Sequence, residues 1–165
     1  MKKLFFISVA VMLLMSVASE AQTKYVYTEA SELNLIYMGK EKIHLEYMLK
    51  AGSANIVWSI ISTPSGLETW FADKVTVKEK IYTFHWGKTE RREAEVISCR
   101  TNNLIRFHWL DEEDKRYNFE LKMNYSELTE DMTLEVTDWA EPDEIEDLKD
   151  LWDSEIDKMK RVSGL

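Results

Sequence analysis

The sequence predicts an α+β fold in which a curved antiparallel sheet wraps around a long C-terminal helix. Three observations lead to this prediction. Short segments of alternating apolar and polar residues fill the middle of the chain, two short helices follow the first of them, and the C-terminal segment changes to a helical period. Because a sheet with one apolar face needs a covering layer, the amphipathic helix is expected to pack on that face.

The strands are predicted from alternation with a period of two residues. The first covers residues 43–49, where apolar and polar side chains alternate strictly. About six more follow the two helices, near residues 75–77, 81–86, 93–99, 104–109, 117–125 and 132–139. The stretches between these strands are short and turn-like or charged, so the strands should form an antiparallel meander.

Two short helices are expected in residues 53–73. Ser53 has a side chain suited to cap the first helix, while Thr63 followed by Pro64 ends that helix and begins the second. The second helix is very short and ends in Trp70 and Phe71. The two helices therefore form the connection between the first strand and the rest of the sheet.

The segment 143–162 is predicted to be one long amphipathic helix. Pro142 suits its first turn, acidic residues are concentrated at its beginning, and basic residues are concentrated at its end, which complements the helix dipole. One polar residue, Glu155, interrupts the apolar stripe. The stripe consists of Ile145, Leu148, Leu151, Trp152, Ile156, Met159 and Val162.

The chain is expected to contain one domain, residues 41–165, preceded by an extension at 22–40. Residues 1–21 resemble a secretory signal, with a basic start, an apolar run and small residues before Ala21. That run is too short to span a bilayer comfortably, so no transmembrane span is expected. Met38 is an alternative initiator. The protein is secreted or periplasmic if the signal is used, and cytoplasmic if translation begins at Met38.

Composition and charge narrow the classes of partner. The chain has 21 Lys and Arg residues against 30 Asp and Glu residues, a net charge of −9, with no basic stripe. Nucleic acid is therefore not an expected partner. The single cysteine, Cys99, has no partner for a disulfide or metal site, and we expect it to be a half-buried strand residue. No metal or cofactor is indicated, because the acidic run 111–114 lacks the ligand spacing of a calcium loop.

Catalytic residues are not evident. His44, His85 and His108 all fall on the polar side of their strands, so they are expected to face solvent. The glycine-flanked serine of hydrolases, the zinc-binding pair of histidines and the phosphate-binding glycine loop are all missing from the sequence. Asp138 is the one acid that alternation turns inward, and it is expected to be a strand-end carboxylate bonded to backbone or arginine.

The order of elements, together with the motif at residues 56–72, resembles a known family. Its most recognisable part is Thr63-Pro64 followed by Trp70-Phe71. The likeness is to the START-like (SRPBCC, helix-grip) superfamily, and within it to the branch named for the activator of the heat-shock-protein-90 ATPase, which includes many uncharacterised bacterial proteins. It covers residues 41–162. The resemblance implies a helix-grip fold with a cavity between the sheet and the C-terminal helix, often used for apolar molecules.

Aromatic side chains at strand spacing would line such a cavity, although rings at this spacing normally form a packed core. The ends of the strands could form its mouth, with Trp86, Trp109 and Trp139 near the tryptophans of the helical segment. The candidate cavity residues are Trp58, Trp70, Phe71, Phe84, Trp86, Phe107, Trp109, Phe119, Trp139, Trp152 and Ile156.

These observations favour a noncatalytic domain that binds a lipid or another small hydrophobic or amphipathic molecule between the sheet and the C-terminal helix. Two alternatives remain open. One is a protein-interaction module resembling the chaperone activators, which would use the surface around the acidic run 111–114. The other is a cyclase-type enzyme, which would need polar groups such as Asp138 or a histidine buried beside a large pocket.

Overall fold

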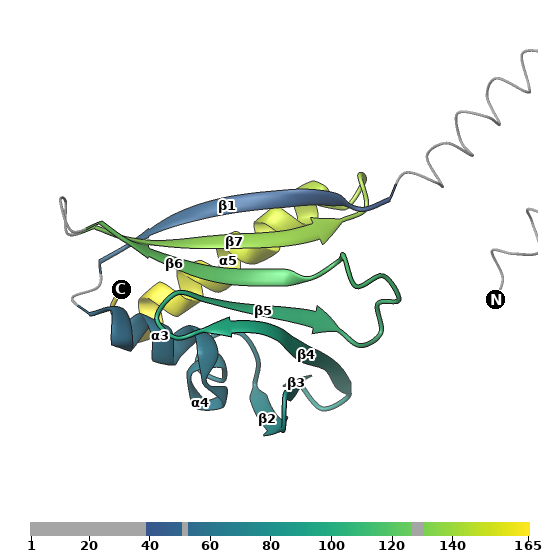
Figure 1. Ribbon diagram of the computed structural model, residues 1–165, viewed down its shortest axis with the longest axis horizontal. Coiled ribbons are helices and arrows are strands. Elements are labelled where there is room, and N and C mark those ends of the chain that lie inside the picture. The colour runs from purple at the N-terminus through teal and green to yellow at the C-terminus, as the bar shows by residue number, and fades with distance from the viewer. Residues whose placement is uncertain (1–38, 51–52, 127–130) are drawn as a thin grey trace, which may run out of the picture. The chain divides into compact units, whose positions relative to one another are not determined.

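The strands form one seven-stranded antiparallel sheet in the order β1-β7-β6-β5-β4-β3-β2 (Figure 1). The computed structural model describes residues 39–50, 53–126 and 131–165. The signal-like segment and nearly all of the extension therefore lie outside the described residues. The strands are β1 (Glu41–Leu49), β2 (Lys74–Lys78), β3 (Ile81–Trp86), β4 (Glu90–Arg100), β5 (Leu104–Trp109), β6 (Phe119–Tyr125) and β7 (Met132–Ala140). The predicted sheet is confirmed.

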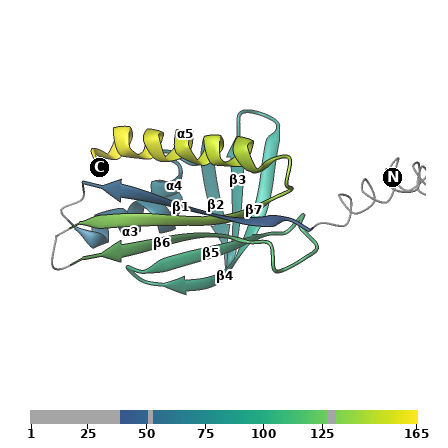
Figure 2. The same ribbon diagram turned by 90° about the horizontal axis from the view of Figure 1, so that it is seen from above.

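In the described part of the chain, three helices accompany the sheet: α3 (Ala54–Ser62), α4 (Pro64–Leu67) and α5 (Ile145–Ser163). Figure 2 shows α5 along one side of the sheet, with β2 and β3 bending towards it. The helix α5 contacts β1 and β7, and α3 contacts β6. This is the predicted α+β arrangement of a curved sheet closed by a C-terminal helix. Among the described residues, no helix has the length and apolar character needed to cross a membrane.

The core lies between the sheet and these helices. Alternate residues of the central strands are buried, as the period of two requires. The helix α5 contributes Trp152, Ile156 and Met159, which are at most 4% exposed. Leu151 and Val162, which the sequence placed in the same apolar stripe, are 55% and 56% exposed. The sheet therefore covers only a narrow strip of the helix.

Thr63 organises the junction between α3 and α4. Its hydroxyl donates to the Ser59 carbonyl at 2.6 Å and accepts from the Gly66 N–H at 3.0 Å, so one side chain ends α3 and caps α4. The predicted role of Thr63 and Pro64 is confirmed. Ser53 occupies the N-cap position of α3, but its side chain makes no capping hydrogen bond. The helix α4 ends at Leu67, before the predicted Trp70 and Phe71.

The helix α5 has the charge pattern that the sequence predicts. Glu146 and Asp147 lie in its first turn, and Lys160 and Arg161 lie in its last turn. Gly164 adopts a φ of 71° at its C-cap, a conformation that glycine accepts without strain. The helix is also tied to the sheet edge, because the Tyr47 hydroxyl of β1 donates to Asp153 at 2.6 Å.

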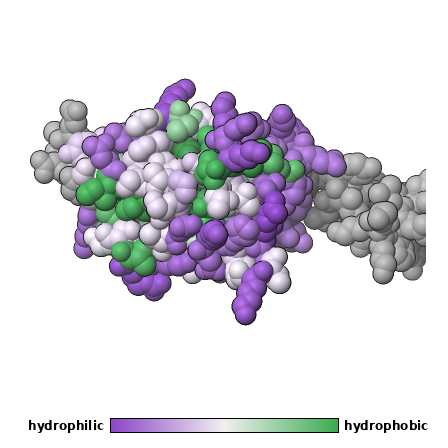
Figure 3. All heavy atoms as spheres, turned by 90° about the horizontal axis from the view of Figure 1, so that it is seen from below, coloured by the Kyte–Doolittle hydropathy of each residue, from purple (hydrophilic) through white to green (hydrophobic). Residues whose placement is uncertain are grey.

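Exposed apolar side chains are spread over the surface. Met48, Ile97 and Tyr125 are examples, and they come from three different strands. The face drawn in Figure 3 carries several small apolar patches separated by hydrophilic side chains. Single exposed apolar residues are ordinary on protein surfaces, so these patches do not by themselves mark an interface.

Candidate ligand pocket

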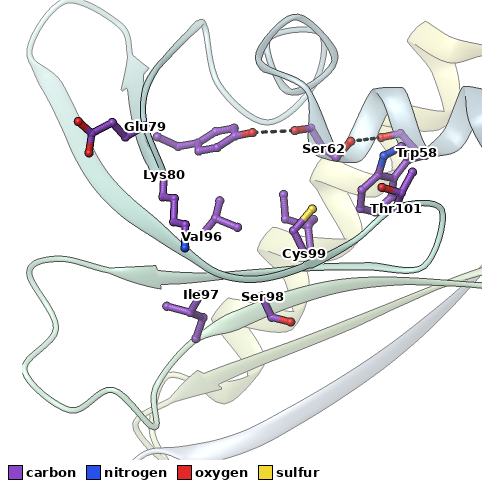
Figure 4. Close-up of a pocket in the computed structure, with 11 residues that line it drawn as sticks. Trp58, Ser62, Glu79, Lys80, Val96, Ile97, Ser98, Cys99 and Thr101 are labelled. Carbon is purple, nitrogen blue, oxygen red and sulfur yellow. Dashed lines mark hydrogen bonds between the residues drawn. The ribbon is translucent and has the colours of Figure 1, made fainter.

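A pocket of about 480 Å³ lies beside α3, between that helix, the β2–β3 turn and the far end of β4 (Figure 4). Its size falls within the range of small-molecule sites. The helix α5 contributes none of its lining, so this is not the cavity that the family resemblance predicted. The lining residues are Trp58, Ser62, Glu79, Lys80, Tyr82, Val96, Ile97, Ser98, Cys99, Thr101 and Ile105.

The pocket exists because β3 and β4 differ in length. The ladder between them begins with Ile81 opposite Glu95, whereas β4 continues to Arg100. The end of β4 therefore has β5 on one side and the pocket on the other. A register shift between Val96 and Ser98 adds a β-bulge at this point. The bulge turns Ile97 and Ser98 to the side of β4 opposite Val96 and Cys99 (Figure 4).

Hydrogen bonds fix the wall that joins α3 to the sheet. The Tyr82 hydroxyl donates to the Ser62 carbonyl at 3.0 Å, and the Ser62 hydroxyl donates to the Trp58 carbonyl at 2.6 Å. Burial, with a smaller contribution from the Cys99 thiol, raises the pKa of Tyr82, so the phenol remains a donor. The floor is apolar, because Ile105 is only 1% exposed and Val96 is half-buried.

Several polar side chains line the pocket. In the described part of the chain, the indole N–H of Trp58, the Thr101 hydroxyl and the Lys80 ammonium form no side-chain hydrogen bond or ion pair. The Cys99 side chain lies on the α3 side of β4 (Figure 4). Cys99 is exposed, which corrects the expectation of a half-buried residue. An apolar floor beneath free donors is an arrangement suited to an amphipathic molecule.

Of the candidate cavity residues, Trp58 is the one that lines this pocket. Most of the others pack against one another between the sheet and α5. The Phe71 ring is their centre, with ring-centroid distances of 5.3 Å to Phe84, 5.8 Å to Phe119 and 5.8 Å to Trp152. These side chains act as core filling. The fully buried members of the candidate set are Trp70, Phe84, Phe107, Phe119 and Ile156.

The predicted mouth of five tryptophans does not form. Trp86 and Trp109 are neighbours at 6.4 Å, and the Arg92 guanidinium covers Trp109 at 4.1 Å. Trp139 instead packs against Tyr117, with ring centroids 5.5 Å apart. Its position in β7 puts its side chain on the face opposite Leu134 and Val136. Strand alternation predicts this outward direction.

Asp138 is a largely buried carboxyl that lies away from the pocket. Asp138 accepts hydrogen bonds from the Trp139 N–H at 2.8 Å and from the Trp152 indole N–H at 2.9 Å. Its inward direction and its bond to backbone are confirmed. Burial raises the pKa of Asp138 to about 6.

The three histidines have different environments. His108 was expected to face solvent but is only 4% exposed, because its Nδ1 lies 3.0 Å from the Tyr117 carbonyl, in the segment leading into β6. His85 is half-buried and His44 is exposed. None of these histidines, nor Asp138, lines the pocket.

Ion pairs explain the acidic hairpin after β5. Arg92 binds Asp111 through two hydrogen bonds, Lys40 pairs with Glu112, and Arg116 pairs with Asp114. The hairpin carboxylates are thus held mainly by cations of the same domain.

Among residues 39–50, 53–126 and 131–165, one group of side chains on the outer sheet face has the spacing of metal ligands. Ligand atoms of His44, Glu46 and Glu135 lie within 4.8 Å of one another. Lys122 and Asn124 already hold the Glu135 carboxylate. The ammonium of Lys122 therefore already balances the charge of the Glu135 carboxylate, so a metal ion is not needed for this purpose.

A curved sheet closed by a C-terminal helix, with a pocket beside it, defines the general class of ligand-binding or cofactor-like α+β domains. Comparison with protein families identifies the superfamily within this class. A family model described as a START-like superfamily domain matches residues 37–165, and the chain belongs to that superfamily. The family suggested by the 56–72 motif is therefore confirmed. No curated protein matches the sequence.

Solved structures agree with this assignment. A Bacteroides fragilis protein studied by NMR in solution is 60% identical, with 75% of this chain and 91% of that chain covered and a TM-score of 0.57. The Aha1 dimer from Colwellia psychrerythraea is 13% identical, with 74% of this chain and 96% of that chain covered and a TM-score of 0.61. An AHSA1-like protein from Aeromonas hydrophila is 13% identical, with 74% of this chain and 91% of that chain covered and a TM-score of 0.62. The last two likenesses establish the fold alone.

Proposed function

We propose that this START-like domain binds a small apolar or amphipathic molecule without changing it chemically, in the pocket beside α3. The observation that carries the proposal is the 480 Å³ pocket, which has an apolar floor and, at its rim, donors that bind no side chain of the described residues. The space between the sheet and α5, where the sequence led us to expect the ligand, is occupied by aromatic rings around Phe71. We therefore place the proposed ligand site at the edge of the core.

The two alternatives receive less support from the site. A cyclase-type reaction would need Asp138 or a histidine beside the pocket, and none of these residues lines it. A protein-interaction role at the acidic hairpin would need free carboxylates, whereas Asp111, Glu112 and Asp114 are paired within the domain. Among the described residues, Glu113 is the carboxylate of this run that has no ion pair. The likeness to the Aha1 dimer concerns the fold and supplies no contact surface.

The chain contains its own reporter for the test. Cys99 is the single cysteine of the sequence and lines the pocket, so its rate of alkylation reports on one site. The probe is N-phenyl-1-naphthylamine, a neutral apolar dye whose fluorescence rises on binding. We expect it to bind the purified protein and to slow alkylation of Cys99.

A matched pair of variants locates the binding. Val96→Trp places a large ring inside the pocket, whereas Val77→Trp places the same ring on an exposed position of β2 outside it. Dye binding and Cys99 protection should be lost in Val96→Trp and kept in Val77→Trp, with circular dichroism confirming that both variants fold. Equal dye binding by the two variants, or no binding by the wild-type protein, would refute the proposal.

A further inference from the structure

We infer that the ligand of this pocket is an amphipathic anion, an apolar body that carries a carboxylate or similar acidic group bound at Lys80. This inference rests on the proposed function and adds the charge of the ligand. It follows from the residues at the rim, from the way the β2–β3 turn holds Lys80, and from the division of the pocket into a polar rim and an apolar floor.

The two charged side chains of the lining point in different directions. Glu79 and Lys80 are the two charged side chains among the lining residues. The Glu79 carboxylate points away from the other lining side chains, whereas the Lys80 side chain extends towards Val96 and β4 (Figure 4). Within the described residues no carboxylate pairs with Lys80. The pocket therefore presents a positive charge, although the chain as a whole carries −9.

The backbone holds Lys80 in this position. Lys78 and Ile81 are opposite one another at the end of the β2–β3 ladder, so Glu79 and Lys80 form a two-residue turn. Glu79 has a φ of 59°, which is uncommon for a residue other than glycine. The Lys80 carbonyl also accepts from the Val96 N–H at 2.8 Å, which joins the turn to β4. The turn conformation and this bond fix the point from which the lysine side chain starts.

Neutral donors complete the rim. The Trp58 indole N–H and the Thr101 hydroxyl lack side-chain partners within the described residues, and they lie beside α3, at the opposite end of the pocket from Lys80 (Figure 4). They can therefore donate to a second polar atom of the ligand, while Lys80 binds the acidic head group. The aromatic ring of Tyr82 and the side chain of Ile105 form the apolar part below. A ligand with a charged head and an apolar body matches both regions, because each part then meets groups of its own character.

The experiment compares three molecules with the same apolar chain: decanoate, 1-decanol and decylammonium. Dissociation constants are measured by isothermal titration calorimetry, with protection of Cys99 from alkylation as a second measurement. Wild-type protein should bind decanoate most tightly and decylammonium most weakly. Raising the salt concentration should weaken decanoate binding and leave decanol binding unchanged, because salt screens an exposed charge pair.

Lys80→Gln removes the charge and keeps a side chain of similar length. It should weaken decanoate binding roughly fivefold, the effect of one exposed ion pair, and leave decanol binding unchanged. Lys78→Gln, at an exposed position of the same hairpin that does not line the pocket, should leave both affinities unchanged.

The outcomes separate the two proposals. If decanol binds as tightly as decanoate and Lys80→Gln changes neither affinity, the preference for an anion is wrong and the binding function stands. If none of the three molecules nor the neutral dye binds, the proposed function itself fails.

Discussion

Asp138 is a largely buried carboxyl whose shifted pKa makes stability depend on pH. Burial raises its pKa from 3.8 to about 6, while the bonds from Trp139 and Trp152 act in the opposite direction. The folded state therefore holds this proton more tightly than the unfolded state does. As pH rises from about 4 to about 6, the free energy of unfolding should fall by about 3 kcal/mol from this group.

Asp138→Asn removes this titration and keeps an amide oxygen as acceptor. Its unfolding free energy should lack the fall, which urea unfolding followed by tryptophan fluorescence at several pH values measures. Asp143→Asn, at an exposed carboxyl before α5, is the control and should keep the wild-type pH dependence. Parallel curves for wild type and Asp138→Asn would show that Asp138 does not cause it.

At single positions, the alternation of apolar and polar residues predicts which face of the sheet a side chain lies on better than it predicts how exposed that side chain is. It correctly turns Asp138 inward and places His108 on the outer side of β5. His108 is nevertheless buried, since the segment before β6 folds over it and accepts its hydrogen bond through Tyr117. Cys99 lies on the inner side but is exposed, because β3 does not extend far enough to cover it. Both cases depend on where neighbouring segments stop, which a strand's own pattern does not contain.

Among the elements, the junction of α3 and α4 depends on Gly66. A Cβ atom at this position would lie 2.1 Å from the Ser59 carbonyl oxygen and 2.6 Å from the Cα of Ile60. Both contacts are with the backbone of α3, so a side-chain rotation cannot relieve them. Gly66→Ala should therefore lower the free energy of unfolding by about 2 kcal/mol or more, measured by urea denaturation.

The same substitution should weaken dye binding, because α3 supplies Trp58 and Ser62 to the pocket. Ser65→Ala, at the exposed neighbouring position, is the matched control, and its stability should stay within about 0.5 kcal/mol of wild type. If Gly66→Ala has wild-type stability and binding, the close packing of α4 on α3 is not what holds the pocket wall.

The elements themselves were largely predictable. Alternation located the strands, and Thr63-Pro64 located the boundary between the two short helices. The pocket was not predictable in this way. It arises from the difference in length between β3 and β4, and from a bulge at Ile97. A bulge changes which residues face the same side after it, so a strict period of two along β4 misassigns the residues that follow.

On the scale of the whole molecule, the packed core and the proposed ligand pocket occupy different places. Aromatic rings from the sheet, from Phe71 and from α5 fill the centre, while the pocket lies at the edge beside α3. The resemblance to the START-like family predicted the architecture correctly. It placed the ligand in the space that these side chains occupy, because family likeness fixes the course of the backbone more closely than the size of the side chains inside it.

Finally, residues 38–165 should fold without the preceding segment. The chain divides into the units Met1–Gly39 and Lys40–Leu165, and the family model begins at residue 37. The buried core cluster of the described residues lies between Ile43 and Met159. A protein starting at Met38 should therefore fold, and its unfolding free energy in urea should agree within about 0.5 kcal/mol with that of a protein starting at Gln22. A shorter protein that is unfolded, or clearly less stable in urea, would show that residues 22–37 belong to the domain.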